Sequence, residues 1–291
     1  MNLLYEPRKK ALSRITNIEN EPEMSEFDSA YLCGIISELR PRKILEIGVA
    51  AGATTAIIMQ CLNDLSIDDC EFISVDINEK YYRDGEGGRD TGFLGIEMKA
   101  QIPGINHRFV LGKVIAGCID EIGAGIDLVI MDTVHYTPGE ILDFPVILPY
   151  LSAKAIVVIH DIAYQFYSNK EGFSNIALMN SVTGIKNIPM GGDETTITRL
   201  PNIGSIKVTE DTMKNIDSVF LMMLLPWTVS PNESELNMYR DCYVRHYSKE
   251  LVDIFDIAVK ANSILISTSP DELKGVIRRF ARALRIMIKG Y

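Results

Sequence analysis

The sequence is short of cysteine, of long apolar runs and of basic residues, and each shortage excludes a class of protein. Its five cysteines form no CxxC pair, and their odd number fits poorly with a disulfide framework. We therefore expect reduced cysteines that serve in packing. The longest apolar stretch, Val219 to Trp227, is far shorter than the roughly 20 residues that a membrane-spanning helix needs.

Basic residues are outnumbered by acidic ones, 29 against 39, which gives a formal net charge of −10. A phosphate backbone needs a positive surface, so a nucleic acid is disfavoured as partner and a small-molecule substrate is favoured. Hydrophobic residues make up 47% and charged residues 23%, as in folded soluble enzymes. Residues 1–10 are too charged for a signal peptide, so a cytoplasmic location is expected.

The order of apolar patterns predicts an open α/β sheet. Residues 26–39 have helical spacing, and Pro41 closes that helix. Short apolar runs, typical of strands buried on both faces, then follow at Lys43 to Ile47, Glu71 to Val75, Arg108 to Leu111, Asp127 to Met131 and Ala155 to Ile159. Helical patterns between several of these runs indicate a doubly wound, mostly parallel sheet whose ligand sites lie beyond the carboxyl ends of the strands.

The last third of the chain has a different pattern. Residues 184–189 and 195–208 contain β-branched residues and glycines that can form a closing hairpin. From residue 209 the pattern is mainly helical, so we predict a domain over 1–208, with helices at its N-terminus, and a helical appendage over 209–291. Residues 218–227 can bury against the core or a second subunit, which leaves a homodimer open. The basic amphipathic segment 274–289 favours a docked helix with a solvated face.

A turn rich in small residues follows the first predicted strand, in the segment EIGVAAGATT at 46–55. Glycine and alanine let the backbone approach a ligand closely, but the spacing is not the G-x-G-x-x-G of nicotinamide binding. Two carboxylates add to this signal. Glu46 ends the first strand, where it can serve an ammonium group directly or through water, and Asp76 ends the second, where it can accept ribose hydroxyls.

Polar residues also follow the fourth and fifth predicted strands. Asp132 and His135 come after one, and His160 and Asp161 end the other, so we expect the four to converge in one crevice. Carboxylate oxygens and imidazole nitrogens can bind divalent metals, and imidazole can move protons near neutral pH. The plainer interpretation is that the histidines cap strand ends.

From about residue 40 to 165 the sequence resembles class I S-adenosylmethionine-dependent methyltransferases. Within them it is similar to the small-molecule O-methyltransferase and cephalosporin-hydroxylase-like groups, whose loops read much like EIGVAAGATT. The resemblance implies a seven-stranded Rossmann-like sheet and S-adenosylmethionine as cofactor. It implies a cofactor-binding set of Glu46, Gly48, Ala50, Gly52, Thr54 and Asp76, in which Asp76 binds the ribose. Two positions depart from the family, since Ala50 stands at a frequent glycine and Lys113 at a position that is often acidic.

The segment also resembles the catechol-type O-methyltransferases, which have a metal site at the ends of strands four and five. That likeness implies Asp132 as first ligand, His135 in the position of the base, and His160 with Asp161 in the paired positions. The implied metal ligands are Asp132, His160 and Asp161, and the implied catalytic residues are His135, Asp132 and His160. A histidine in place of a carboxylate softens the site, so Mg²⁺, Mn²⁺, Zn²⁺ and no metal all stay open.

We therefore predict methyl transfer to an oxygen of a small molecule or sugar. A catalytically inactive cofactor-binding or interaction module and a nicotinamide-dependent oxidoreductase are the alternatives. Two further segments concern access to the site. Residues 164–192 are rich in aromatic residues and methionine and can form a lid or pack in the core, and residues 81–93 form a glycine-rich, charged insertion that we expect to be a solvated loop.

Overall fold

The computed structural model describes residues 2–15, 24–85, 87–166, 173–189 and 200–267. Seven strands form a single sheet in the order β3-β2-β1-β4-β5-β7-β6. The strands are β1 (Lys43–Ile47), β2 (Glu71–Asp76), β3 (His107–Leu111), β4 (Ile126–Met131), β5 (Leu151–His160), β6 (Ile185–Asn187) and β7 (Ile203–Lys207). All five runs predicted as strands are strands, which confirms the doubly wound sheet.

The sheet is parallel from β3 to β5 and ends in an antiparallel hairpin. In register, Ile47 of β1 pairs with Val75 of β2 and Met131 of β4, so these three strands end at the same level. β7 runs antiparallel to β5, with His160 opposite Ile203, and β6 pairs antiparallel with β7. The closing hairpin predicted from residues 184–189 and 195–208 is therefore present, except that residues 190–199 lie outside the described part.

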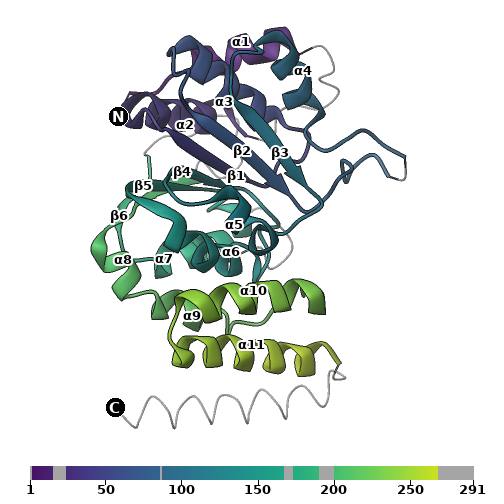
Figure 1. Ribbon diagram of the computed structural model, residues 1–291, viewed down its shortest axis with the longest axis vertical. Coiled ribbons are helices and arrows are strands. Elements are labelled where there is room, and N and C mark those ends of the chain that lie inside the picture. The colour runs from purple at the N-terminus through teal and green to yellow at the C-terminus, as the bar shows by residue number, and fades with distance from the viewer. Residues whose placement is uncertain (1, 16–23, 86, 167–172, 190–199, 268–291) are drawn as a thin grey trace.

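Helices cover both faces of the sheet (Figure 1). One face carries α1 (Glu6–Arg14), α2 (Glu26–Leu39), α3 (Ala53–Asp64) and α4 (Phe93–Gln101). The other carries α5 (Ile119–Ile122), α6 (Gly139–Ile147) and α7 (Ser174–Ser181). Alternate strand residues serve the two faces. Ile44 packs in the buried cluster on the side of α2 and α3, and Leu45 packs in the cluster on the side of α5, α6 and α7.

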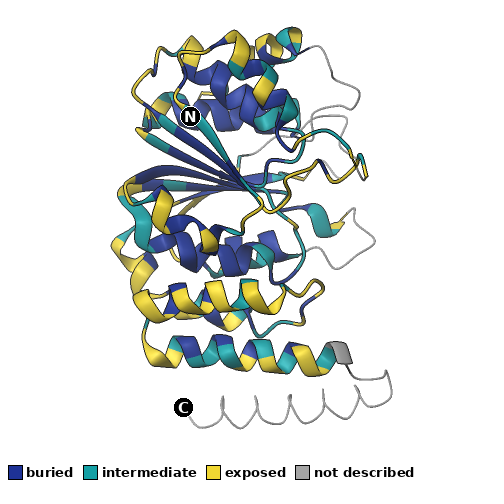
Figure 2. Cartoon of the chain, turned by 45° about the vertical axis from the view of Figure 1, so that its right-hand side comes forward, coloured by how far each residue is buried: buried dark blue, intermediate teal, exposed yellow. Residues whose placement is uncertain are grey.

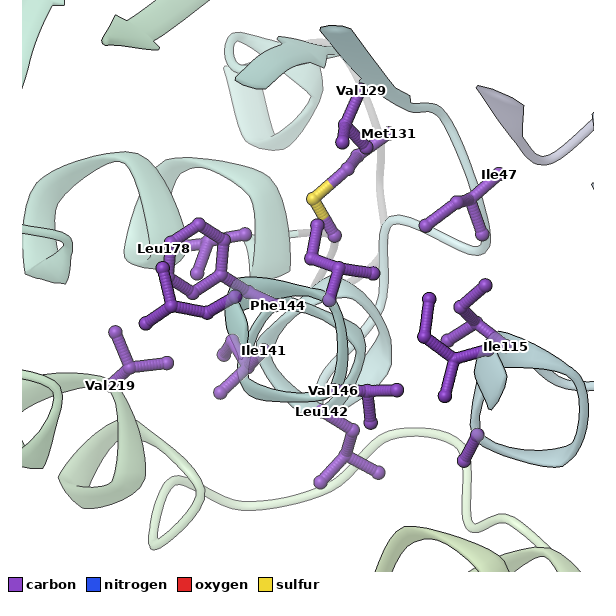
Figure 3. Close-up of a cluster of buried hydrophobic side chains, with 14 of the residues drawn as sticks. Ile47, Ile115, Val129, Met131, Ile141, Leu142, Phe144, Val146, Leu178 and Val219 are labelled. Carbon is purple, nitrogen blue, oxygen red and sulfur yellow. The ribbon is translucent and has the colours of Figure 1, made fainter. Parts of the chain in front are cut away.

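The C-terminal helices form a further layer below the second face (Figure 1). They are α8 (Glu210–Lys214), α9 (Asp217–Met222), α10 (Glu233–His246) and α11 (Lys249–Ser267). Val219 of α9 lies near Phe144 of α6 in the buried cluster (Figure 3), and Tyr239 and Phe255 belong to the same cluster as strand residue Met131. The appended helices therefore share the core of the sheet, and the outer faces of α10 and α11 are exposed (Figure 2).

Local signals explain where several helices begin and end. The Ser25 hydroxyl accepts the Asp28 N–H at the start of α2, and Arg40, in left-handed conformation, ends that helix before Pro41. Asn232 and Glu235 form a capping box at the start of α10.

Four segments connect these elements. They are the single helical turns η1 (Ile115–Gly117), η2 (Leu148–Tyr150) and η3 (Tyr164–Phe166), and the insertion between β2 and α4 that extends beside the sheet in Figure 1.

Three further expectations concerned the cysteines, membrane-spanning helices and the basic C-terminal segment. All five cysteines lie in the described part, where they are buried and free, as expected for packing residues. No helix within the described ranges is long and apolar enough to cross a membrane. The basic segment predicted over 274–289 lies outside the described residues.

Candidate active site

A cavity of about 630 Å³ opens at the carboxyl ends of the central strands. Its walls come from the loops after β1, β2, β3 and β4, and also from the segment that leads into α10. The lining residues used below are Gly48, Ala50, Asp76, Ile77, Val114, Ile115, Asp132, Val134, His135, Tyr136, Asp143, Tyr164, Val229, Glu235 and Tyr239. The cavity thus lies at the strand ends, where the sheet rule predicts ligand sites.

The loop after β1 depends on backbone conformations that favour glycine. Gly48 has φ +92° and Gly52 has φ +87°. A Cβ on Gly48 would lie 1.9 Å from the Asp132 carbonyl oxygen, and a Cβ on Gly52 would lie 2.8 Å from Gly92 Cα. Gly48 thus lets the loop pack against the end of β4, and Gly52 lets α3 begin against the insertion.

Ala50 also has a positive φ, of 50°, at the position where the family often has glycine. Its Cβ makes this conformation unfavourable by about 1 kcal/mol. The insertion supports the loop here, because the Gly92 N–H donates to the Ala50 carbonyl over 2.9 Å and the Leu94 N–H to the Ala51 carbonyl over 3.0 Å. Residues 81–93 are therefore more than a solvated loop, and Tyr82 lines the cavity.

Asp76 organises the same loop from the end of β2. Its Oδ2 accepts the N–H groups of Val49 and Ala50, at 2.8 and 3.1 Å, and its Oδ1 accepts the N–H of Asn78 at 2.8 Å. The carboxylate also lines the cavity, so it remains available to ligand hydroxyls.

Glu46 lies beneath the loop and is 1% exposed. Its Oε2 accepts the hydroxyls of Thr55 and Ser74, at 2.7 and 2.6 Å, whereas Oε1 has no hydrogen-bond partner among the described residues. Burial raises the pKa of Glu46 to about 8, against the lowering effect of the two hydroxyls. Glu46, Gly52 and Thr54 do not line the cavity, unlike Gly48, Ala50 and Asp76.

Asp132, His135 and Asp161 bring their side-chain polar atoms together on the other side of the cavity. His135 Nε2 lies 3.2 Å from Asp161 Oδ2 and 3.8 Å from Asp132 Oδ1. One potential ligand atom from each of the three residues lies within 4.8 Å of the others, a spacing that a metal ion can bridge. The convergence expected from the sequence is present.

His160 lies deeper than the other members of the cluster and is 3% exposed. Its Nδ1 is 3.2 Å from Asp132 Oδ1, and its Nε2 is 3.5 Å from Asp28 Oδ2 of α2. Burial alone would lower the pKa of His160, but the charges of Asp132 and Asp161 raise it well above its usual value. His160 does not line the cavity, and it connects Asp132 to a buried carboxylate of the N-terminal helices.

Glu140 of α6, which sequence reasoning missed, holds the His135 segment in place. One Glu140 oxygen accepts the His135 N–H at 3.1 Å and the Thr133 hydroxyl at 2.8 Å, and lies 3.6 Å from His135 Nδ1. Burial would lower the pKa of His135, but Glu140, Asp132 and Asp161 outweigh burial and raise it to about 9. A carboxylate directly before the mostly apolar run of residues 141–148 was the available signal.

Two asparagines complete the polar network and were also missed. Asn175 of α7 has Nδ2 3.2 Å from His135 Nδ1 and donates to the His160 carbonyl, and Asn202 donates to Asp161 Oδ1. His135 and Asp161 both have positive φ, of 61° and 56°. Strained backbone at two neighbouring polar residues is typical of functional sites.

Aromatic residues border the Asp132 side of the cavity. The rings of His135 and Tyr164 lie 5.1 Å apart, and the hydroxyls of Tyr136 and Tyr164 lie 3.4 Å apart. Farther along residues 164–192, Met179 is buried and Phe166 is 65% exposed, so this segment serves both the core and the surface. Met190 lies outside the described residues.

Comparison with known proteins gives one family match. Residues 45–162 match a family described as a methyltransferase domain. This segment falls within residues 40–165, for which the sequence resembles class I methyltransferases, and it contains nearly all of the parallel part of the sheet. A search of curated protein sequences found no significant match.

Among solved structures, the chain is similar to the O-methyltransferase TomG from Streptomyces achromogenes, involved in tomaymycin synthesis and solved in complex with SAM. The identity is 17% and the TM-score 0.50, over 72% of this chain and 92% of that chain. Cofactor-bound Rv0187 from MTB has 13% identity and a TM-score of 0.50, over 70% of this chain and 90% of that one. At these identities the likeness defines the fold.

Proposed function

We propose that this chain transfers the methyl group of S-adenosylmethionine to a hydroxyl oxygen of a small molecule or sugar. One observation carries the proposal: the glycine loop, Asp76, Asp132 and His135 line the same cavity, and Asp161 Oδ2 lies 3.2 Å from His135 Nε2. TomG, an O-methyltransferase solved with SAM, has the same fold. The cofactor, when bound, supplies an electrophilic methyl group on a positively charged sulfur.

The cofactor side of the cavity fits such a ligand in shape and charge. Gly48 and Ala50 keep the wall at backbone level, and Asp76 offers carboxylate oxygens to ribose hydroxyls. Asp132 and Asp161 add negative charge across the cavity, which favours a cationic sulfur and an ammonium group.

On the acceptor side, His135 is the proposed base. In its neutral form, Nε2 takes the proton of the acceptor hydroxyl, and Asp132 and Asp161 stabilise the imidazolium that results. Glu140 and Asn175 orient the ring from the side of Nδ1. Tyr136 and Tyr164 offer flat surfaces to an aromatic or sugar acceptor.

His160 is a positioning residue in this scheme, since it contacts Asp132 and not the cavity. Together with Asp28 it fixes the direction of the Asp132 carboxylate. The buried Asp28 carboxylate, the half-buried Asp132 carboxylate and the His160 imidazolium compensate one another, which makes the burial of His160 and Asp28 energetically possible.

A metal-assisted variant of the same function is supported by the converging donors. Asp132, His135 and Asp161 offer two carboxylates and one imidazole, a set that suits Mn²⁺ or Zn²⁺ and accepts Mg²⁺ less readily. The set implied by the resemblance has His160 in place of His135. We favour His135 as ligand, because it lines the cavity and offers a ligand atom close to those of Asp132 and Asp161, whereas His160 does not line the cavity. A bound divalent ion would stabilise an ionised hydroxyl.

A thermal melt with added ligands tests the proposal. S-adenosylmethionine and S-adenosylhomocysteine should raise the melting temperature, because a ligand that binds only the native state stabilises it by mass action. NAD should have no effect. A shift with NAD alone would favour an oxidoreductase and overturn the proposal, and binding without methyl transfer to any catechol, phenol or sugar in a panel would favour an inactive module.

Metal dependence is tested on the same protein. The protein is dialysed against EDTA, and Mn²⁺, Zn²⁺ or Mg²⁺ is then titrated into the wild type and into Asp161→Asn by calorimetry. Tight binding by the wild type that is lost in the variant supports the metal-assisted variant. Full activity after EDTA treatment, with no calorimetric binding, leaves His135 as the base without a metal.

A further inference from the structure

The cavity has a third wall that comes partly from residues outside the matched methyltransferase segment. Val229, which precedes α10, and Glu235 and Tyr239 of α10 line the cavity together with Asp143 of α6. The matched family segment ends at residue 162, so α10 is an addition that reaches the binding cavity.

Apolar side chains also line this cavity. Ile77 follows Asp76 directly, and Val134, Val114 and Val229 line the cavity with it. Ile77 is 47% exposed, Val134 44% and Val229 45%, whereas the aliphatic residues of the central strands are mostly buried. Exposed aliphatic side chains around a cavity form surfaces on which a planar ring can pack.

A buried carboxyl group lines the same cavity. Asp143 is 6% exposed, and its Oδ1 accepts the Tyr239 hydroxyl over 2.6 Å. Among the described residues, no other donor reaches its second oxygen and no basic side chain pairs with it. Burial raises the pKa of Asp143 to about 7, against the lowering effect of the Tyr239 hydrogen bond. A desolvated carboxyl group that lines a cavity without a cation is suited to a ligand N–H.

The other acidic and basic groups at this wall already have partners. Glu235 Oε2 accepts the Asn232 N–H in the capping box of α10. Lys113, which follows β3, pairs with Glu121 over 3.4 Å. Glu235 is half-buried, so among the carboxyl groups of this wall Asp143 is the buried one with an open acceptor.

We propose that Asp143, held in place by Tyr239, accepts a hydrogen bond from the amino group of the purine base of the cofactor, so that the added helix α10 contributes to base specificity. This inference rests on the proposed function. The ring would pack between Ile77, Val114 and Val134 with its amino edge toward Asp143. The role would compensate for Lys113, which stands where the family often has an acidic residue.

Calorimetry with two product analogues tests this inference on the full chain. S-adenosylhomocysteine carries the amino group, and S-inosylhomocysteine carries a carbonyl oxygen in its place. The wild type should prefer the adenosyl compound by about tenfold or more, the effect of one hydrogen bond to a charged group. Asp143→Asn should lose or reverse this preference, because its amide can donate to the carbonyl oxygen of inosine.

Tyr239→Phe gives an independent variant, since it leaves Asp143 intact and removes only the group that positions it. Its preference for the adenosyl compound should fall by roughly threefold to tenfold, the effect of one neutral hydrogen bond. Asp256→Asn, at an exposed pair with Arg240, is the matched control and should keep the preference of the wild type. Circular dichroism verifies that each variant is folded.

The outcomes separate this inference from the proposed function. Wild-type preference retained by both Asp143→Asn and Tyr239→Phe would overturn the role of the wall and leave the methyltransferase proposal intact. Failure of the wild type to bind either compound would overturn both. Loss of preference in the two variants, with wild-type behaviour in Asp256→Asn, would support the inference.

Discussion

The two sides of the cavity are built in different ways. On the cofactor side, after β1 and β2, the ligand surface is largely backbone, shaped by Gly48 and Ala50 and fixed by Asp76. On the acceptor side, after β4 and β5, it consists of side chains that hold one another, with His135 among three carboxylates. A backbone surface tolerates little added volume, whereas a side-chain network can be altered one group at a time.

The largest effect is expected at the backbone side, from Gly48→Ala. The new Cβ would lie 1.9 Å from the Asp132 carbonyl oxygen at a φ of +92°, so β1 and β4 would have to separate locally. Overpacking and the unfavourable conformation together should cost about 3 kcal/mol or more. Denaturant unfolding measures this loss, and calorimetry should detect no binding of S-adenosylhomocysteine.

Ala50→Gly is the matched control for this loop. Its φ of 50° suits glycine, so the variant should keep cofactor binding and have wild-type stability within about 1 kcal/mol. Equal behaviour of Gly48→Ala and Ala50→Gly would show that the cofactor side is not shaped by close backbone packing.

On the side-chain side, His135→Asn should reduce methyl transfer by about 10²–10⁴-fold, the usual contribution of a general base. Asparagine tolerates the left-handed conformation of residue 135 better than most residues, so the fold should be kept. Binding of S-adenosylhomocysteine should change by less than about threefold. A parallel loss of binding and turnover would argue against a catalytic role.

These two sides also differed in how well the sequence revealed them. Apolar runs predicted the central strands, and strand ends pointed to Asp76, Asp132, His135 and Asp161, because parallel strands end at one edge. The loop glycines were identified by type and spacing. The placement of the Glu46 side chain could not be predicted in the same way. A carboxylate at a strand end can point to the ligand or lie beneath the loop, and here the hydroxyls of Thr55 and Ser74 hold it beneath the loop.

The partners of the histidines could not be predicted from one sequence. Asp28 and Asn175 come from helices that lie far from residues 132–161 in the chain, and only the tertiary packing brings them to His160 and His135. The same holds for Tyr239, which meets Asp143 across 96 residues. Short-range patterns carry no information on such contacts, although the two acidic residues of the buried helix α6, Glu140 and Asp143, were a usable hint.

The pH dependence of turnover sharpens the role of His135. Its pKa is raised to about 9, so the imidazole is mostly protonated at pH 7 and becomes an effective base as the pH rises. If no metal is bound, kcat/KM should rise about tenfold per pH unit between pH 7 and 8 and level off near pH 9. A profile that is flat over this range would exclude His135 as the base. Thermal melts at each pH control for unfolding.

The smallest effect is expected from Glu46→Gln, which changes charge beneath the backbone side without altering its shape. Glu46 has a pKa of about 8 in the folded state against an ordinary value of 4.5, so the folded chain holds a proton that the unfolded chain has released. Stability should therefore fall as the pH rises from about 4.5 through 8. Glutamine can still accept the Thr55 and Ser74 hydroxyls, and the variant should lose this component of the pH dependence.

Denaturant unfolding at pH 6 and pH 9 measures the effect of Glu46→Gln. The difference in unfolding free energy between the two pH values should be smaller in the variant than in the wild type, while S-adenosylhomocysteine binding at pH 6 should change by less than about threefold, because Glu46 does not line the cavity. A large loss of binding with unchanged pH dependence would instead place the Glu46 carboxylate in contact with the ligand. In that case the cofactor side, like the acceptor side, would depend on the charge of a side chain as well as on the shape of the backbone.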